Sequence, residues 1–331
     1  MEEEKDFKEF YNEFHRAVED KLAQYIKVTE PRNLYEPFKY IMTGGGKRIR
    51  PVLSMICSGA VGGDPYSALD AAAAVEILHN FTLVHDDIMD KSPLRRGRET
   101  VHTKWNEPAA IITGDAMVGA AYRLLESYEN HPRSADILRT FSTGLVEVCE
   151  GQAYDMAFGD MMDVDIPDYI MMVEKKTAKL IETAVLVGAY SGGCTDECAD
   201  SLRKFAISLG IAFQIQDDML DLTAEQLKLG KKIGQDILEG KKTYLILRAK
   251  EKAVKDEDVA LINRFFIESG LPEESVPEIR DLFERLGIIE DAQQKVDEYI
   301  ADASNAIAAL KSNKYVDMLH WLLESLNKRK F

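Results

Sequence analysis

The feature that most limits the possible folds of this chain is a long stretch without proline. No proline occurs between Asp168 and Leu271, a span of about a hundred residues. Because proline breaks the interior of a helix, this stretch can hold long helices. Apolar residues recur at helical spacing, as at Leu282, Leu286 and Ile289, and alternating strand-like runs are nearly absent. The sequence therefore predicts an all-α protein.

The 331 residues are predicted to form a single domain, 1–331, since no change in composition marks a boundary. Sparse glycines stand at expected joints, such as Gly192–Gly193 and Gly270. Two acidic stretches, Asp256–Asp258 and Glu273–Glu278, are predicted to be surface loops.

The charge and composition exclude several classes of partner. A net charge of -16 argues against nucleic acid or an anionic membrane as the main partner. The start MEEEKDFKEF is too acidic for a signal peptide, and no apolar run is long enough for a membrane span. The four cysteines lack the spacing of a zinc site or a disulfide framework. A cytoplasmic protein is expected.

One motif occurs twice, each time at the end of a predicted helix. Residues 71–90 contain neither Gly nor Pro and close with Asp86, Asp87 and Asp90, and Pro93 stops the helix. Residues 201–221 end in the same way. Helical spacing places the outer carboxylates of each motif one turn apart on one face. The three aspartates of the second motif are Asp217, Asp218 and Asp221.

Aspartates are unfavourable at these positions, because a helix C-terminus already carries partial negative charge and like charges four residues apart repel. One such cluster alone is equally explained as a solvated acidic helix end. Two clusters approached by apolar sequence favour a cavity lined by carboxylates. Oxygen ligands in this arrangement suit Mg²⁺, which also binds substrate phosphates.

Basic residues follow both acidic motifs and indicate an anionic substrate. The glycine-rich stretch 44–51, GGGKRIRP, carries three cations, and Arg95 and Arg96 follow the first acidic motif. Lysines also stand at 176, 231–232 and 241–242. Lys and Arg beside flexible glycines suit phosphate oxygens, and no nucleotide-binding GxxxxGK[ST] pattern is present. These groups predict a site for a diphosphate.

The motifs GGGKRIRP, EILHNFTLVHDDIMDKSPLRRG, GQAYD, KT and FQIQDDMLDL stand in the order typical of one family. From about Tyr35 to its C-terminus, the chain resembles the trans-type isoprenyl diphosphate synthases, in particular the archaeal short-chain type. The resemblance implies an isoprenoid synthase-type helical bundle around a deep central cavity, and a homodimer.

It further implies three Mg²⁺ ions between the two motifs. Asp86, Asp90 and Asp217 would be direct ligands, and Asp87, Asp218 and Asp221 would contact the ions through water or orient the ligands. The allylic diphosphate would be held by Arg95, Lys176, Lys232 and Lys241, with Lys231 next to the best-fitting Lys232. Isopentenyl diphosphate would be held by Lys47, Arg50, His79 and Arg96.

The implied reaction is a head-to-tail condensation of isopentenyl diphosphate with dimethylallyl, geranyl or farnesyl diphosphate through an allylic carbocation. Thr177, Gln214 and the carbonyl of Lys176 would direct oxygen dipoles at that cation. Gln214 lies four residues before Asp218, on the same helix face. No activated side-chain nucleophile is evident.

In the family, bulky residues just before the first motif limit the product length. Phe81 followed by the smaller Thr82 resembles the archaeal pattern and implies a twenty-carbon product, geranylgeranyl diphosphate. Farnesyl diphosphate or a mixture is the alternative. A class I terpene cyclase and a non-catalytic prenyltransferase subunit are more remote, since the second motif is complete and both paired arginines are present.

Overall fold

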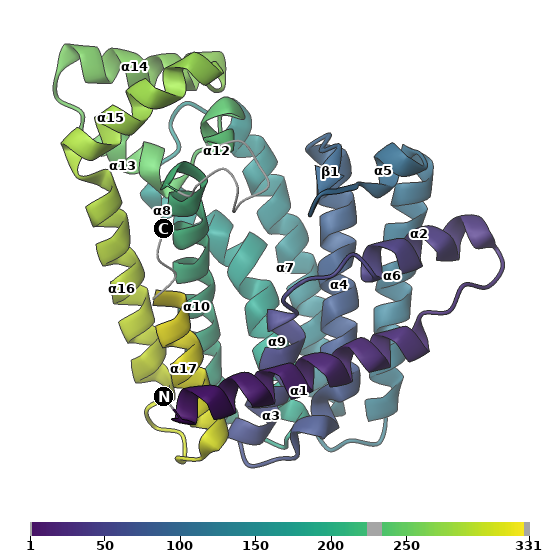
Figure 1. The fold of residues 1–331 in the computed structure, drawn as a ribbon. Coiled ribbons are helices and arrows are strands. Elements are labelled where there is room, and N and C mark those ends of the chain that lie inside the picture. The colour runs from purple at the N-terminus through teal and green to yellow at the C-terminus, as the bar shows by residue number, and fades with distance from the viewer. Residues whose placement is uncertain (1, 224–233, 328–331) are drawn as a thin grey trace. The chain divides into compact units, whose positions relative to one another are not determined.

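The computed structural model describes residues 2–223 and 234–327, and most of these are helical (Figure 1). The predicted all-α class is confirmed. Lys231 and Lys232 lie outside the described residues. The chain forms two compact units, described separately below. The first unit comprises Met1–Leu145, Glu182–Arg203 and Ala309–Trp321, and the second comprises Val146–Ile181, Lys204–Ala308 and Leu322–Phe331. The single domain expected from the sequence stays a prediction.

The first unit is built around α4 (Leu69–Met89), which packs along α6 (Glu107–Leu125) and contacts α1 (Glu2–Tyr25) and α3 (Ile49–Ala60) (Figure 1). The alanines at 71–74 favour a helix and are fully buried, so neighbouring helices approach closely. Its other elements are α2 (Arg32–Met42), η1 (Pro65–Ala68), α5 (Val101–Lys104), η2 (Glu126–Tyr128) and the first part of α7 (Ser134–Asp160).

The end of α4 is set by backbone hydrogen bonds. Lys91 has a positive φ of 51°, the N–H of Ser92 donates to the carbonyl of Asp87 at 3.0 Å, and that of Lys91 donates to Ile88 at 3.2 Å. This left-handed termination satisfies two carbonyls that would otherwise lack partners. The helix therefore ends where Pro93 predicted, and its last turn carries the three aspartates.

A small β-hairpin follows α4, which the sequence did not predict. Strands β1 (Leu94–Arg95) and β2 (Arg98–Glu99) pair antiparallel, with Arg95 opposite Arg98. The two residues between them, Arg96 and Gly97, have φ of 54° and 72°. Positive φ at both central residues is the tight hairpin turn that matches strand twist. The turn fixes the backbone direction at the paired arginines.

The second unit contains α8 (Ile166–Val173), the π-helix η3 (Glu174–Ala178), and most of α10 (Asp196–Thr223). Helix α9 (Lys179–Ser191) starts in it, and α17 (Lys314–Asn327) ends in it. The remaining elements are α12 (Gln235–Leu238), α13 (Tyr244–Lys252), α14 (Asp256–Glu268), η4 (Glu273–Ser275), α15 (Val276–Leu286) and α16 (Ile288–Ile307).

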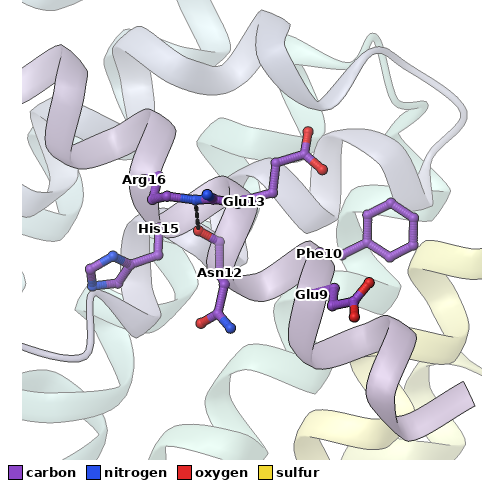
Figure 2. A pocket seen from close by; sticks show the side chains of 6 residues that line it. All are labelled: Glu9, Phe10, Asn12, Glu13, His15 and Arg16. Carbon is purple, nitrogen blue, oxygen red and sulfur yellow. Dashed lines mark hydrogen bonds between the residues drawn. The ribbon is translucent and has the colours of Figure 1, made fainter. Parts of the chain in front are cut away.

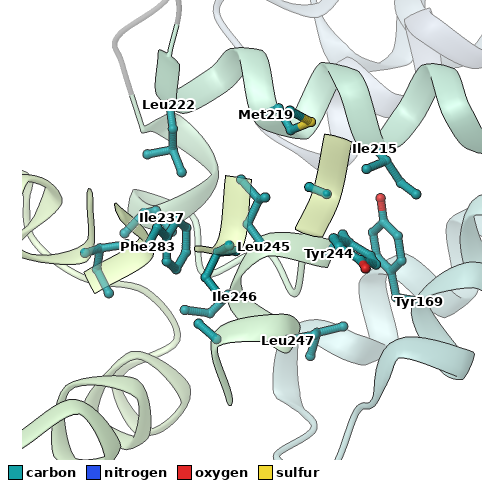
Figure 3. Packing of buried hydrophobic residues seen from close by; sticks show 14 of the residues in the cluster. Tyr169, Ile215, Met219, Leu222, Ile237, Tyr244, Leu245, Ile246, Leu247 and Phe283 are labelled. Atoms are coloured by element: carbon teal, nitrogen blue, oxygen red, sulfur yellow. The ribbon is translucent and has the colours of Figure 1, made fainter. Parts of the chain in front are cut away.

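The core of this unit positions α10. Figure 3 shows Ile215, Met219 and Leu222 of α10 in the same buried cluster as Tyr244 of α13 and Phe283 of α15. These apolar positions of α10 recur every three or four residues, so one stripe of the helix is buried. Asp217 and Asp221 fall outside that stripe and are partly exposed.

Both acidic stretches predicted as loops are partly or wholly helical instead. Asp256–Asp258 form the first turn of α14, and Asp258 pairs with Arg285 at 2.8 Å. Glu273 opens the short η4, and α15 begins at Val276. Acidic residues are favourable at a helix N-terminus, because the helix dipole is positive there.

Among the described residues, no helix combines the length and the apolar character needed to cross a membrane.

Candidate active site

The first acidic motif separates its aspartates by burial. Asp87 is 1% exposed and its Oδ1 pairs with Arg95 Nε at 2.7 Å, whereas Asp86 is half-buried and Asp90 is exposed at the helix end. Burial raises the pKa of Asp87, and the charge of Arg95 opposes that rise. Asp86 and Asp90 lie one turn apart on the helix, as predicted, and Asp87 faces the protein.

The charges of four arginines act on His79 of α4. Removal from bulk water lowers the pKa of His79 well below its usual value, and the positive charges of nearby arginines lower it further. The ring is therefore neutral at pH 7. The arginines are Arg50, Arg96, Arg95 and Arg48, so both predicted basic stretches reach this part of the first unit.

The predicted cations of the glycine-rich stretch differ in role. Lys47 is exposed and Arg50 is half-buried in the first turn of α3. Arg48 is 3% exposed and bonds Glu19 and Glu76, each at 2.6 Å. Its guanidinium is thus committed to protein carboxylates, and the sequence was wrong to count it with the cations available to an anion.

A hollow of about 30 Å³ lies between the glycine-rich stretch and the hairpin. Arg95 and Arg96, which the sequence assigns to the binding of diphosphates, both line it. Sequence reasoning missed two further residues that line it, Arg98 and Tyr40. The guanidinium carbon of Arg98 lies 4.0 Å from the centroid of the Tyr40 ring. The RRGR run was the available signal for Arg98, because strand pairing brings it opposite Arg95.

The second acidic motif is ordered by hydrogen bonds within the second unit. Asp218 is buried and accepts from Tyr169 Oη at 2.7 Å and from Gln214 Nε2 at 2.9 Å. Burial, together with the charge of Asp236, raises the pKa of Asp218 to about 8. Asp217 and Asp221 remain partly exposed, so each motif buries its middle aspartate and leaves the outer pair accessible.

Thr177 and Gln214, for which one shared role was predicted, are joined by a hydrogen bond. Thr177 Oγ1 donates to Gln214 Oε1 at 2.9 Å, and Gln214 donates onward to Asp218. Lys176 Nζ bonds Asp155 at 2.5 Å. These residues stand on or beside the π-helical turn η3, a form common at functional sites and not predicted from the sequence. Gly151 permits this packing, since a Cβ there would collide with the Lys176 backbone.

A hollow of about 100 Å³ lies over this network. Lys176, Lys241 and Lys242 line it. Of these, Lys242 is buried and donates to the carbonyl of Gly159 at 2.7 Å. Asp236 also lines it, and its N–H donates to Asp221 Oδ2 at 3.1 Å. Sequence reasoning missed Asp236, although it stands in the run KIGQDI, which begins at Lys232.

The residues fit Mg²⁺ rather than a metal held by protein ligands alone. Among the residues the structure describes, no three His, Cys, Asp or Glu side chains form a ready metal-binding group. Mg²⁺ commonly takes one or two carboxylates and completes its shell with water and substrate phosphates. The outer aspartates of each motif, beside hollows lined by Lys and Arg, suit that mode of binding.

Phe81 and Thr82 precede the first motif on α4. Phe81 is 8% exposed, and its ring stacks edge-to-face on His85 with centroids 4.8 Å apart. Thr82 donates to the carbonyl of His79 at 2.8 Å. Their predicted effect on product length stays a prediction, as do the individual roles of all the site residues above.

The model of the polyprenyl synthetase family matches residues 31–281. The chain belongs to this family. It is 43% identical over 239 residues to a geranylgeranyl diphosphate synthase of Methanosarcina mazei, which covers 72% of this chain and 74% of that protein. A short chain isoprenyl diphosphate synthase of Methanothermobacter thermautotrophicus is 35% identical over 316 residues, 96% of each chain.

A solved structure agrees with this assignment. The geranylgeranyl pyrophosphate synthetase of Pyrococcus horikoshii superposes with a TM-score of 0.91 and 34% sequence identity, covering 98% of this chain and all of that one. The resemblance seen in the sequence motifs is thereby confirmed, and the expected isoprenoid synthase fold with it.

Proposed function

We propose that this protein condenses isopentenyl diphosphate head-to-tail with allylic diphosphates and forms geranylgeranyl diphosphate. The observation that carries the proposal is the pair of hollows, each beside one aspartate motif and each lined by Lys or Arg. A protein that bound only cations would have no use for these basic side chains. The names of the two relatives support the same chemistry.

Mg²⁺, three ions per active site, would neutralise the diphosphate and make it a better leaving group. Asp86, Asp90 and Asp217 would ligate the ions directly. Asp87 and Asp218 are buried and hydrogen-bonded, which suits orienting roles, and Asp221 holds the N–H of Asp236.

Ionisation breaks the allylic C–O bond, and the electron pair leaves with the diphosphate. Arg95, Lys176 and Lys241 would stabilise the negative charge that develops there, together with Lys232. The Thr177–Gln214 pair and the Lys176 carbonyl would place oxygen dipoles near the carbocation. The double bond of isopentenyl diphosphate then forms the new C–C bond, and a proton passes to an oxygen of the departed diphosphate.

Lys47, Arg50, His79 and Arg96 would hold isopentenyl diphosphate. The neutral state of His79 suits this role, since a neutral imidazole can donate one hydrogen bond without adding charge to four arginines. Phe81 would form the floor that stops growth at twenty carbons, and farnesyl diphosphate is the alternative product.

The protein is further proposed to act in the cytoplasm as a homodimer. Helix α6 carries Ile111 and Ile112, which are 42% and 55% exposed. Exposed apolar side chains that lie together on a surface can mark a site of protein contact, and the proposed partner at this one is a second copy of the chain. The mass in solution, measured by light scattering, tests the dimer.

Incubation with Mg²⁺, isopentenyl diphosphate and each allylic primer tests the function. A linear prenyl diphosphate of twenty carbons, with release of one diphosphate per addition, is the expected result. Cyclic hydrocarbon would identify a terpene cyclase, and no turnover with any primer would contradict the proposal.

A further inference from the structure

The glycine-rich stretch between α2 and α3 has a demanding backbone. Gly45, Gly46 and Arg48 all have positive φ, of 74°, 146° and 50°. A non-glycine residue at positive φ costs free energy, so surrounding contacts must hold Arg48 there. Three consecutive carbonyls of this stretch, at residues 45–47, accept hydrogen bonds from side chains.

Helix α1 supplies two of those donors. Tyr11 Oη donates to the carbonyl of Lys47 at 2.5 Å, and His15 Nε2 lies 3.3 Å from the carbonyl of Gly46. A carbonyl accepts only, so this contact requires the proton of His15 on Nε2. The third carbonyl, of Gly45, accepts from Arg96.

A third contact lies one turn further along α1. Glu19 pairs with Arg48 at 2.6 Å, and the other guanidinium nitrogens of Arg48 bond Glu76 and the carbonyl of Met42, each at 2.6 Å. Tyr11, His15 and Glu19 are spaced by four residues, which places them along one face of the helix. That face holds three successive residues of the stretch: Gly46, Lys47 and Arg48.

The contacts orient the peptide groups as well as fixing the loop. In a trans peptide the C=O and N–H bonds point in opposite directions. Because the carbonyls of Gly46 and Lys47 point toward α1, the N–H groups of Lys47 and Arg48 point away from it. Carbonyl oxygens would repel a diphosphate, whereas N–H groups attract one. The helix therefore keeps the repelling atoms on its own side.

We infer that α1 is a positioning element for the isopentenyl diphosphate subsite, with Tyr11, His15 and Glu19 as positioning residues. This inference rests on the proposed function, which assigns Lys47 and Arg50 to that substrate. None of the three side chains needs to touch the substrate. Their contribution is to hold Lys47 and the adjacent peptides in one conformation before binding, which lowers the ordering cost of binding.

The same helix offers a matched control. A surface hollow of about 780 Å³ is lined by His15 together with Asn12 and Arg16, whose side chains are drawn in Figure 2. The only hydrogen bond drawn between residues of that view runs from Arg16 Nε to the carbonyl of Asn12, at 3.3 Å. The exposed Asn12 side chain therefore shares the helix turn and the hollow with His15, and replacing it leaves the loop contacts intact.

The test compares Tyr11→Phe, His15→Ala and the double variant with Asn12→Ala and the wild type. The loss of one hydrogen bond of about 1 kcal/mol raises the KM for isopentenyl diphosphate roughly fivefold. The double variant is expected to raise it about tenfold or more, with the KM for the allylic substrate unchanged within about twofold. Tyr11→Phe keeps the ring, so folding is preserved, and thermal unfolding checks this.

An equal rise in both KM values, or no rise in either, would overturn the inference. If the wild type does not condense the two substrates, the proposed function fails by itself. Calorimetric titration of isopentenyl diphosphate then decides the inference separately: weaker binding by Tyr11→Phe than by Asn12→Ala supports it, and equal binding rejects it.

Discussion

The imidazole of His85 fills the space that a Cβ atom on Gly114 would occupy. Its Nε2 lies 3.3 Å from the carbonyl of Ile111, and its ring stacks on Phe81. Helix α6 can therefore approach α4 only because residue 114 has no side chain. The structure places His85 between α6 and Phe81, as a support for the Phe81 ring.

Gly114→Ala is expected to destabilise the protein by about 1–3 kcal/mol, because His85 must leave a close-packed position. The matched control is Gly119→Ala on the same helix, where an added Cβ meets nothing within 4 Å. That change is expected to be neutral or to stabilise by about 0.5–1 kcal/mol, since alanine favours a helix. Urea unfolding measures both variants, and equal stabilities would contradict the close approach.

The pKa of His79 predicts a pH dependence of stability. Its pKa in the folded protein lies below the ordinary value of about 6.5, because the half-buried ring is partly removed from water and the charges of Arg50, Arg96, Arg95 and Arg48 oppose its protonation. Below that pH the unfolded chain binds a proton that the folded protein does not, so stability falls as the pH falls. At about one pH unit above 6.5 and higher, neither state binds the proton, and the contribution is constant.

His79→Gln removes this titration. Free energies of unfolding, measured in urea from pH 5 to pH 8, are expected to fall less steeply below about pH 6.5 in the variant. His102→Gln serves as the control, since His102 is not among the groups that lower the pKa of His79. Parallel curves for wild type and His79→Gln would show that the ring is not held neutral.

The aspartates are expected to act through bound Mg²⁺. Asp86→Ala and Asp217→Ala should each lower kcat by about a hundredfold or more, because each removes a group that stabilises developing charge. Removal of Mg²⁺ with EDTA should abolish activity, and its readdition should restore it. Asp20→Ala, at an exposed position of α1, is the control. Wild-type activity in either motif variant would remove that motif from the mechanism.

The two acidic helix ends could be predicted from the sequence because both the helical period and its termination are local. The place of Asp87 and Asp90 at a helix end could be predicted from the proline-free run before them and from Pro93 after them. The role of Arg48 could not be read in this way, since its partners Glu19 and Glu76 lie about thirty residues away on either side. Burial that depends on distant partners leaves no local pattern.

Two other features were not predicted from the sequence, for different reasons. The strands of the hairpin span two residues each, too short for any alternating pattern to appear. The acidic run Asp256–Asp258 was interpreted by its charge, although the same charge favours the first turn of a helix. Composition alone does not distinguish a solvated loop from a helix N-terminus.

Phe81→Ala is expected to lengthen the product beyond twenty carbons. Its ring is 8% exposed and stacked on His85, so truncation leaves a space that a growing chain can enter.

Val84→Ala is the control for Phe81→Ala, because Val84 is also buried in the same helix but has no ring to stack on His85. Products from farnesyl diphosphate are dephosphorylated and compared by chain length. Longer chains from Phe81→Ala alone support the floor, whereas the same profile from all three proteins would remove Phe81 from the control of product length. A lengthened profile from His85→Ala, which keeps the Phe81 ring but removes its support, would show that the stacked pair acts together.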